Sequence, residues 1–199
     1  PETAVSSYPP LPTATEEIID GAEQTIRDAC AEHRVGAIVG TPRNGFNSAM
    51  VIDENGREIG RHNKMQLVPD DEPWASPGNE LSVFELSGIP LSVIVCHDKR
   101  YPELCRIPVL GGSRLIVYIS AEAYHDDLPL TNIKRGWSRE RFDEERRVYR
   151  AQSQARAVEN RVWLLKSNYA GVPSTPASDA VGLVGSHGGS CIISPTGIV

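Results

Sequence analysis

The chain has 199 residues, 40% of them hydrophobic and 23% charged, and carries a formal net charge of −6. This balance is typical of one globular domain or two small ones. The acidic charge argues against a nucleic-acid partner, because phosphate binding needs a basic face, and no apolar run approaches the roughly 20 residues of a membrane span.

The first predicted element is an amphipathic helix that follows a proline-rich loop. Thr13 and Glu16 form the pattern of a capping box, with Thr13 as the N-cap. Apolar residues then follow at helical spacing, and Gly36 is expected to end the helix. A short buried strand over 37–39 comes next.

A β-hairpin is predicted after this strand. Two strand-like runs, 47–53 and 57–64, flank the pair Asn55-Gly56. This dipeptide between two such runs favours a type I′ turn, which needs residues that tolerate positive φ. The hairpin therefore places Lys64 near the end of its second strand.

The remainder of the chain alternates strands and helices around polar loops. Strands are expected over 81–86, 91–95, 115–119, 161–166 and 191–194, helices from Pro102 and over 138–160, and loops over 66–79, 121–134 and 171–189. The run 91–95 is nearly all apolar, as in a strand covered on both faces. Because a hairpin stands among these elements, we expect a mixed sheet in one domain spanning 1–199.

The most informative single residue is Cys96, which follows the apolar run 91–95 and precedes a polar turn and a helix. This is a crevice position of α/β sheets. Backbone N–H groups there can form an oxyanion hole, and a helix dipole or a nearby cation would lower the thiol pKa. From its position alone, a buried structural cysteine remains the simpler interpretation.

The surrounding residues add a resemblance to a known family. Residues 93–103 run from an apolar strand into Cys-His-Asp-Lys-Arg-Tyr-Pro-Glu. This segment resembles the nucleophile segment of the nitrilase, or carbon–nitrogen hydrolase, family, with His97 where members often carry tyrosine. The hairpin that ends at Lys64, the pair at 77–78, the run 155–160 and the run 189–197 resemble further family segments in the same order. The resemblance therefore spans essentially the whole chain.

The resemblance implies an α-β-β-α sandwich and a Glu–Lys–Cys triad. Glu2 matches the general base, Lys64 the triad lysine and Cys96 the nucleophile. Glu72, eight residues past Lys64, resembles a second glutamate that is often counted as a fourth catalytic member. The backbone N–H of His97 is expected to join the oxyanion hole. Family members carry further elements on both sides of these segments, so the domain is expected to be partial, truncated at both ends.

Each assignment has a plainer structural alternative. Without the resemblance, Glu2 would be interpreted as an exposed terminal carboxylate and Lys64 as a solvated lysine at a strand end. Asp70 and Asp71 stand beside Glu72, so these three acidic residues form a pattern that is also typical of a solvated loop.

The chemistry of the triad explains why these residue types are needed. A thiolate is a strong nucleophile at neutral pH, a carboxylate can take and return its proton, and an ammonium can hold an oxyanion. The expected function is hydrolysis of a non-peptide C–N bond in a small amide or carbamoyl compound, without a cofactor. The alternatives are a nitrilase or an N-acyltransferase with the same triad, and a catalytically inactive binding scaffold.

Other groups carry weaker signals. His97, Asp98 and His125 lack the spacing of a metal site, so no metal is expected. The glycine-rich run 182–189 lacks the Gly-Lys-Ser/Thr of a phosphate-binding loop, and the charge run 139–150 is typical of a solvated helix face. The cysteines form no Cys-x-x-Cys pair, which favours reduced thiols in a cytoplasmic protein. The resemblance also implies a homodimer or a higher homo-oligomer.

Overall fold

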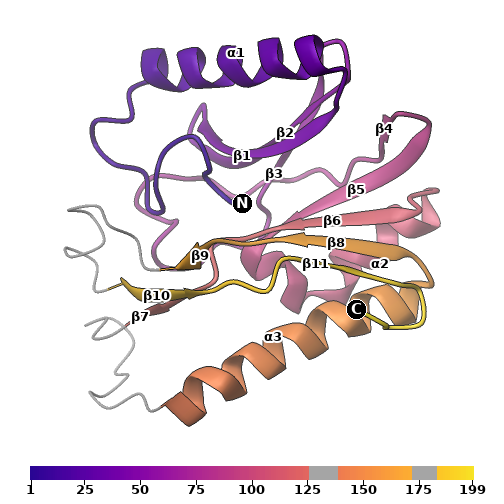
Figure 1. Ribbon diagram of the computed structural model, residues 1–199. Helices are drawn as coiled ribbons and strands as arrows, with labels where there is room; N and C mark the ends of the chain where they lie inside the picture. Colours follow the sequence, from indigo (N-terminus) through magenta and orange to yellow (C-terminus); the bar gives the residue numbers. More distant parts are fainter. Residues whose placement is uncertain (126–138, 172–182) are drawn as a thin grey trace.

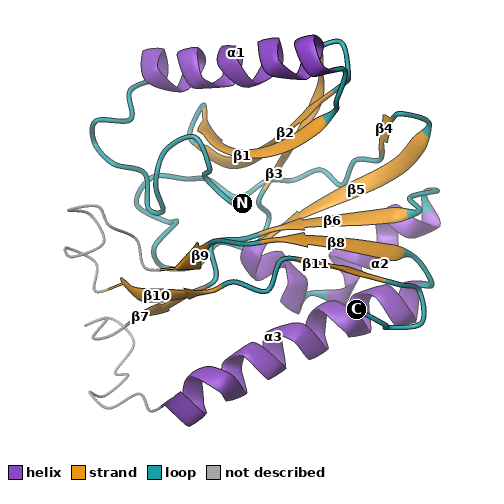
Figure 2. Cartoon of the chain, viewed as in Figure 1, coloured by secondary structure: helices purple, strands orange, loops and turns teal. Residues whose placement is uncertain are grey.

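The computed structural model describes residues 1–125, 139–171 and 183–199. Figures 1 and 2 show four layers in the order helix, sheet, sheet, helices. The first two layers are α1 (Glu16–His33) and a sheet of β1 (Ala37–Arg43), β2 (Phe46–Ile52) and β3 (Glu58–Asn63). The other two are a sheet of β4 (Phe84–Leu86), β5 (Ile89–Val95), β6 (Leu115–Ile119), β8 (Trp163–Ser167) and β11 (Cys191–Ile193), with helices η1 (Cys96–Arg100), α2 (Pro102–Leu110) and α3 (Arg139–Asn160). The α-β-β-α arrangement expected from the sequence is therefore present.

Helix α1 begins and ends at different caps from those predicted. Thr15, not Thr13, is the N-cap, because its Oγ1 accepts the Ile18 N–H at 3.4 Å. Arg34, not Gly36, takes the left-handed conformation at the C-terminus, with φ of 55°. Gly36 is needed for another reason. A Cβ there would lie 2.7 Å from a methyl carbon of Leu86.

The first sheet has its type I′ turn at Asn44-Gly45, and the type I′ turn predicted at Asn55-Gly56 is wrong. Asn44 and Gly45 join β1 to β2 with φ of 50° and 73°, as a two-residue type I′ turn requires. At the predicted turn, Gly56 has a positive φ and Asn55 does not. There the Asp53 carboxylate accepts the N–H of Asn55 at 2.8 Å, which stabilises a longer turn of another type.

The second sheet is mixed, as predicted. Its order is β11-β8-β6-β5-β4, in which β5, β6 and β8 are parallel and the two edge strands are antiparallel. The side chains of Leu91 to Val95 are buried on both faces. One face of the sheet packs on the first sheet through Ala49, Val51, Leu91, Val93, Val95, Val117 and Ile119. The other packs on the helices through Ile94, Leu104, Cys105, Ile116, Tyr118, Ala157, Val162, Leu164 and Ile193.

Two segments predicted to be loops contain strands. β7 (Ala123–His125), β9 (Ala170–Gly171) and β10 (Leu183–His187) form a small antiparallel sheet in the order β7-β10-β9. These pairings join residues far apart in the chain, so no local pattern marks them. The rest of the two predicted loops, 126–134 and 172–182, lies outside the described residues. Among the described helices, none is long and apolar enough to cross a membrane.

Candidate active site

The parallel strands β5, β6 and β8 all have their carboxyl ends at the same end of the second sheet. α/β folds commonly place their sites at this end. Cys96 directly follows β5, while Glu122 and Asn168 lie just beyond β6 and β8. The first residues of the chain reach the same end, because the Glu2 N–H donates to the carbonyl oxygen of Ser120 at 3.3 Å. Figure 1 shows the N-terminus between the two sheets.

Cys96 makes a sharp turn from β5 into η1. Its φ of 46° lies in the left-handed region, which costs a non-glycine residue about 1–3 kcal/mol. The buried Asp98 carboxylate holds this turn by accepting three backbone hydrogen bonds. The donors are the N–H groups of Val95 at 3.0 Å, Met65 at 3.2 Å and Gln66 at 2.8 Å. The turn is thus tied to β5 and to the segment that follows β3.

Glu2, Lys64 and Asp71 form a buried ion cluster, called here the Lys64 cluster. The side chains of all three have no exposed surface. Lys64 Nζ lies 2.7 Å from Glu2 Oε1 and 2.7 Å from Asp71 Oδ2. Asn47 Nδ2 donates to both carboxylates, at 2.6 and 3.1 Å, and the Ala121 N–H donates to Glu2 Oε2 at 3.0 Å. The structure therefore brings two of the predicted residues, Glu2 and Lys64, into direct contact.

The charges of this cluster fix the protonation state of its lysine. Burial alone would lower the pKa of Lys64. The negative charges of Glu2 and Asp71 outweigh burial and hold the Lys64 pKa well above its ordinary value. Lys64 therefore stays an ammonium at neutral pH.

The backbone around Glu2 is also closely held, so this residue is not an exposed terminal carboxylate. A Cβ at Gly40 would lie 2.7 Å from the Glu2 Cα and 2.3 Å from the Pro1 carbonyl oxygen, so β1 needs glycine where the first residues cross it. Tyr169 Oη donates to the Glu2 carbonyl oxygen at 2.8 Å. Strand β1 and the segment after β8 thus hold the Glu2 backbone in place.

The structure does not bring Glu72 into the cluster. Its side chain is exposed, and the neighbouring Asp71 makes the contact with Lys64 instead. The local turn explains this exchange. The Asp71 N–H donates to Val68 O at 2.8 Å and the Val68 N–H donates to Asp71 Oδ2 at 3.0 Å, which turns Asp71 inward. The carboxylate that contacts Lys64 is therefore that of Asp71, seven residues after it, and not that of Glu72, which the spacing had suggested.

Cys96 is half-buried, and its thiol lies in the field of several charged groups. Burial and the charge of Glu2 raise the pKa of the Cys96 thiol to about 12, although Lys64 and Lys99 act to lower it. Among the described residues, no direct hydrogen bond joins the sulfur to Glu2 or Lys64. The thiol is therefore protonated in this arrangement, and its proton must leave before the sulfur can act as a nucleophile.

A second buried ion cluster was not expected from the sequence. Lys99, Glu122 and Lys166, called here the Glu122 cluster, are 3%, 5% and 6% exposed. Lys99 Nζ donates to Glu122 Oε1, and Lys166 Nζ donates to Oε2 at 2.6 Å. Tyr118 Oη also donates to Oε1. One signal was present: Lys166 shares a strand face with the core residue Leu164, so a charged side chain points inward from an apolar strand.

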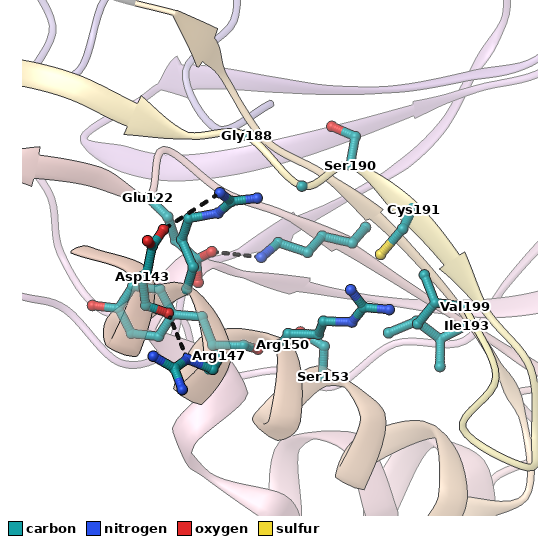
Figure 3. A pocket seen from close by; sticks show the side chains of 14 residues that line it. Glu122, Asp143, Arg147, Arg150, Ser153, Gly188, Ser190, Cys191, Ile193 and Val199 are labelled. Atoms are coloured by element: carbon teal, nitrogen blue, oxygen red, sulfur yellow. Dashed lines mark hydrogen bonds and ion pairs between the residues drawn. The ribbon is translucent and has the colours of Figure 1, made fainter. Parts of the chain in front are cut away.

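A cavity of about 380 Å³ borders the Glu122 cluster on the side of α3. In Figure 3, Glu122 and Asp143 lie at one end of this cavity, and Cys191, Ile193 and Val199 lie at the other. Its lining does not include the side chains of Glu2, Lys64 or Cys96. Among the described residues, no group of three or more His, Cys, Asp or Glu side chains could hold a metal ion.

Comparison with known proteins gives a consistent set of relatives. The model of the carbon–nitrogen hydrolase family matches residues 1–199. A 2-oxoglutaramate amidase of Bacillus subtilis (strain 168) is 29% identical over 171 residues, which are 84% of this chain and 56% of that protein. The chain spans 56% to 58% of the length of three such curated relatives.

Two solved structures share the fold. A carbon–nitrogen hydrolase from Helicobacter pylori G27 superposes with a TM-score of 0.79 at 22% identity, covering 91% of this chain and 62% of that one. A variant of the amidase from Nesterenkonia sp. AN1 superposes with a TM-score of 0.70 at 26% identity, covering 93% of this chain and 63% of that one. That structure shows the acetamide moiety of fluoroacetamide covalently added at the active-site cysteine.

Proposed function

The chain belongs to the carbon–nitrogen hydrolase family, and we propose that it cleaves the C–N bond of a small amide or carbamoyl compound through a thioester on Cys96. The observation that carries the proposal is the buried Glu2–Lys64 ion pair at the end of the sheet where the strained Cys96 turn begins. The covalent adduct on the active-site cysteine of the Nesterenkonia amidase supports the same role for a cysteine here.

In the proposed first half-reaction, the Glu2 carboxylate accepts the Cys96 proton as the sulfur attacks the carbonyl carbon. The carbonyl oxygen gains the negative charge, which the Lys64 ammonium and the His97 backbone N–H stabilise. As the tetrahedral intermediate collapses, the C–N bond breaks, and the protonated Glu2 gives its proton to the leaving nitrogen. Ammonia or an amine departs, and the acyl group remains on sulfur as a thioester.

The second half-reaction repeats these roles with water. Glu2 removes a proton from water, whose oxygen attacks the thioester carbonyl, and the oxyanion again lies against Lys64 and the His97 N–H. The C–S bond then breaks, the carboxylic acid leaves, and the thiolate takes the proton back from Glu2. We propose that Asp71, rather than Glu72, supports this cycle by holding the Lys64 ammonium at 2.7 Å.

A substrate panel tests the proposal. Primary amides, carbamoyl compounds and nitriles are incubated with the protein, while released ammonia and the intact mass of the protein are followed. We expect ammonia from amides or carbamoyl compounds, together with a transient mass increase equal to the acyl group. Turnover confined to nitriles, or transfer of the acyl group to hydroxylamine in preference to water, would favour the nitrilase or acyltransferase alternative. A folded protein that yields neither product nor adduct would overturn the proposal.

A further inference from the structure

The Glu122 cluster is attached to the turn that carries Cys96. Lys99 belongs to η1, three residues after Cys96, while Glu122 follows β6 and Lys166 lies on β8. The Lys99 ammonium bonds to Glu122, and the Lys99 carbonyl oxygen accepts a hydrogen bond from Arg156 Nε of α3 at 2.8 Å. Both the side chain and the backbone of one residue in the nucleophile turn are therefore fixed by other elements.

Aromatic rings complete the surroundings of this lysine. Lys99 Nζ lies 3.9 Å from the centre of the Tyr149 ring and 5.5 Å from that of Tyr118. A cation over an aromatic face is stabilised by the ring, most when it is shielded from water. The Lys99 side chain is thus held in place on the face of the second sheet that α3 covers.

The balance of charge in this cluster is unusual for a purely structural group. Two ammonium groups share one carboxylate, so the Glu122 cluster has an excess positive charge. Buried ion pairs seldom stabilise a fold more than apolar residues of the same volume would. The Lys64 cluster has the opposite excess, two carboxylates around one ammonium. The Cys96 thiol lies in the field of both clusters.

We propose that Lys99 is a positioning residue for the nucleophile: through its bond to Glu122 it holds the strained Cys96 turn, and its charge stabilises the thiolate. The proposal rests on the nucleophilic role assigned to Cys96 above. The turn costs free energy on its own, so it persists only where its surroundings hold it. Asp98 holds the turn through backbone hydrogen bonds, and Lys99 holds it through its side-chain bond to Glu122.

The charges that face the thiol have opposing effects. Lys64 and Lys99 lower the pKa of Cys96, whereas Glu2 and Glu122 raise it. Tyr8, Tyr118 and Tyr149 are further ionisable groups near it, and His97 and Asp98 follow it in η1. Loss of the Lys99 charge and loss of the Glu122 charge should therefore shift the thiolate titration in opposite directions. Simple damage to the fold would not produce such a pair of shifts.

The test measures how fast iodoacetamide alkylates Cys96 between pH 6 and about pH 11, read by intact mass and peptide mapping. Below the pKa of the thiol the rate follows the thiolate fraction, so a shift of the midpoint is obtained from the displacement of the rate–pH line, even where the midpoint itself lies near pH 12. We expect the midpoint to rise in Lys99→Gln, with alkylation at pH 8 slowed about tenfold, which corresponds to one pKa unit. Lys99→Arg should restore the wild-type midpoint, and Glu122→Gln should lower it. Unchanged midpoints, or shifts of the same sign in Lys99→Gln and Glu122→Gln, would overturn the proposal.

Two controls keep this test decisive. If Lys99→Gln does not fold, Glu122→Gln alone decides, because an unchanged or raised midpoint contradicts the proposal. Alkylation needs no turnover, so a protein that hydrolyses no member of the substrate panel still reports on Lys99. The failure of the proposed function and the failure of this inference are thereby distinguishable.

Discussion

The Lys64 cluster and the Glu122 cluster each contain three charged side chains, with the signs of the charges exchanged. In the first, Glu2 and Asp71 share one lysine; in the second, two lysines share Glu122. The first joins the chain's first residues to the segment after β3, and the second lies beneath the second sheet, against α3. The sulfur of Cys96 lies in the field of both.

This difference shows how one end of the sheet can hold both an ionised general base and a thiol that must become a thiolate. A general base must be ionised and close to the thiol, which places negative charge where a thiolate is disfavoured. The excess positive charge of the Glu122 cluster offsets that effect without occupying the side on which the Lys64 cluster lies. The two clusters share no residue, so each can be altered by substitutions outside the other.

The largest effect is expected from removing the shared ammonium of the Lys64 cluster. Lys64→Met leaves two buried carboxylates without their cation, which should cost about 3–5 kcal/mol of unfolding free energy and abolish turnover. Lys166→Met is the matched change in the Glu122 cluster and should cost less, because Lys99 still neutralises Glu122. Urea denaturation of both variants tests this ranking. Equal losses of unfolding free energy in the two variants would contradict this ranking.

Removing the proposed base should affect rate more than stability. Glu2→Gln keeps only one of the two oxygens that accept from Lys64 Nζ and from the Ala121 N–H, and it cannot take a proton, so kcat should fall about 10²- to 10⁴-fold. The matched control is Glu72→Gln, at an exposed side chain outside the cluster. It should leave kcat within about twofold, since exposed substitutions change stability by only about 0.5 kcal/mol. A large loss in Glu72→Gln would restore the role first predicted for that residue.

Asp71→Asn tests whether the carboxylate that contacts Lys64 matters more than the exposed carboxylate of Glu72. The change removes one of the two negative charges on Lys64 and keeps the side-chain shape, so kcat should fall by about tenfold, between the effects of Glu2→Gln and Glu72→Gln. Steady-state kinetics of the three variants give this order directly. If kcat is unchanged in Asp71→Asn, the 2.7 Å contact between Asp71 and Lys64 has no part in the reaction.

A smaller effect concerns pH. Burial raises the pKa of both Cys96 and Cys105 to about 12, from the ordinary 9.0 expected in an unfolded chain. The folded state therefore favours the neutral thiols, and this contribution is complete below pH 9 and is lost as pH rises from 9 towards 12. Unfolding free energy should decline over that range. The unfolding free energy of Cys105→Ala and of the wild-type chain is measured at pH 8 and at pH 10. The decline between the two pH values should be smaller in Cys105→Ala.

The sequence predicted those parts of the molecule that depend on neighbouring residues. The apolar strand before Cys96 and the helix after Pro102 follow from local patterns. The type I′ turn predicted at Asn55-Gly56 was wrong because the loop there is longer than two residues, so Asn55 does not take the positive φ that Asn44 takes in the two-residue turn. The pairings of β7, β9 and β10 depend on residues distant in the chain, which no local pattern reveals.

The candidate site shows the same limit. Glu2, Lys64 and Cys96 were predicted because ordered family motifs marked them, and the structure brings Glu2 and Lys64 into contact. Asp71 replaced Glu72 because a local turn fixed which carboxylate faces inward. The Glu122 cluster was missed because Glu122 is 23 residues from Lys99 and 44 residues from Lys166, and only the packing of three elements brings them together.

The most direct test of the central assignment is to locate the acyl group during turnover. Wild-type protein is quenched within one turnover of a reactive amide, digested, and mapped by mass spectrometry beside Cys96→Ala and Cys191→Ala. We predict an acylated peptide containing Cys96 in the wild type and in Cys191→Ala, and neither adduct nor turnover in Cys96→Ala with an unchanged melting temperature. Turnover by a folded Cys96→Ala, or an adduct on Cys30, Cys105 or Cys191 instead, would contradict the assignment.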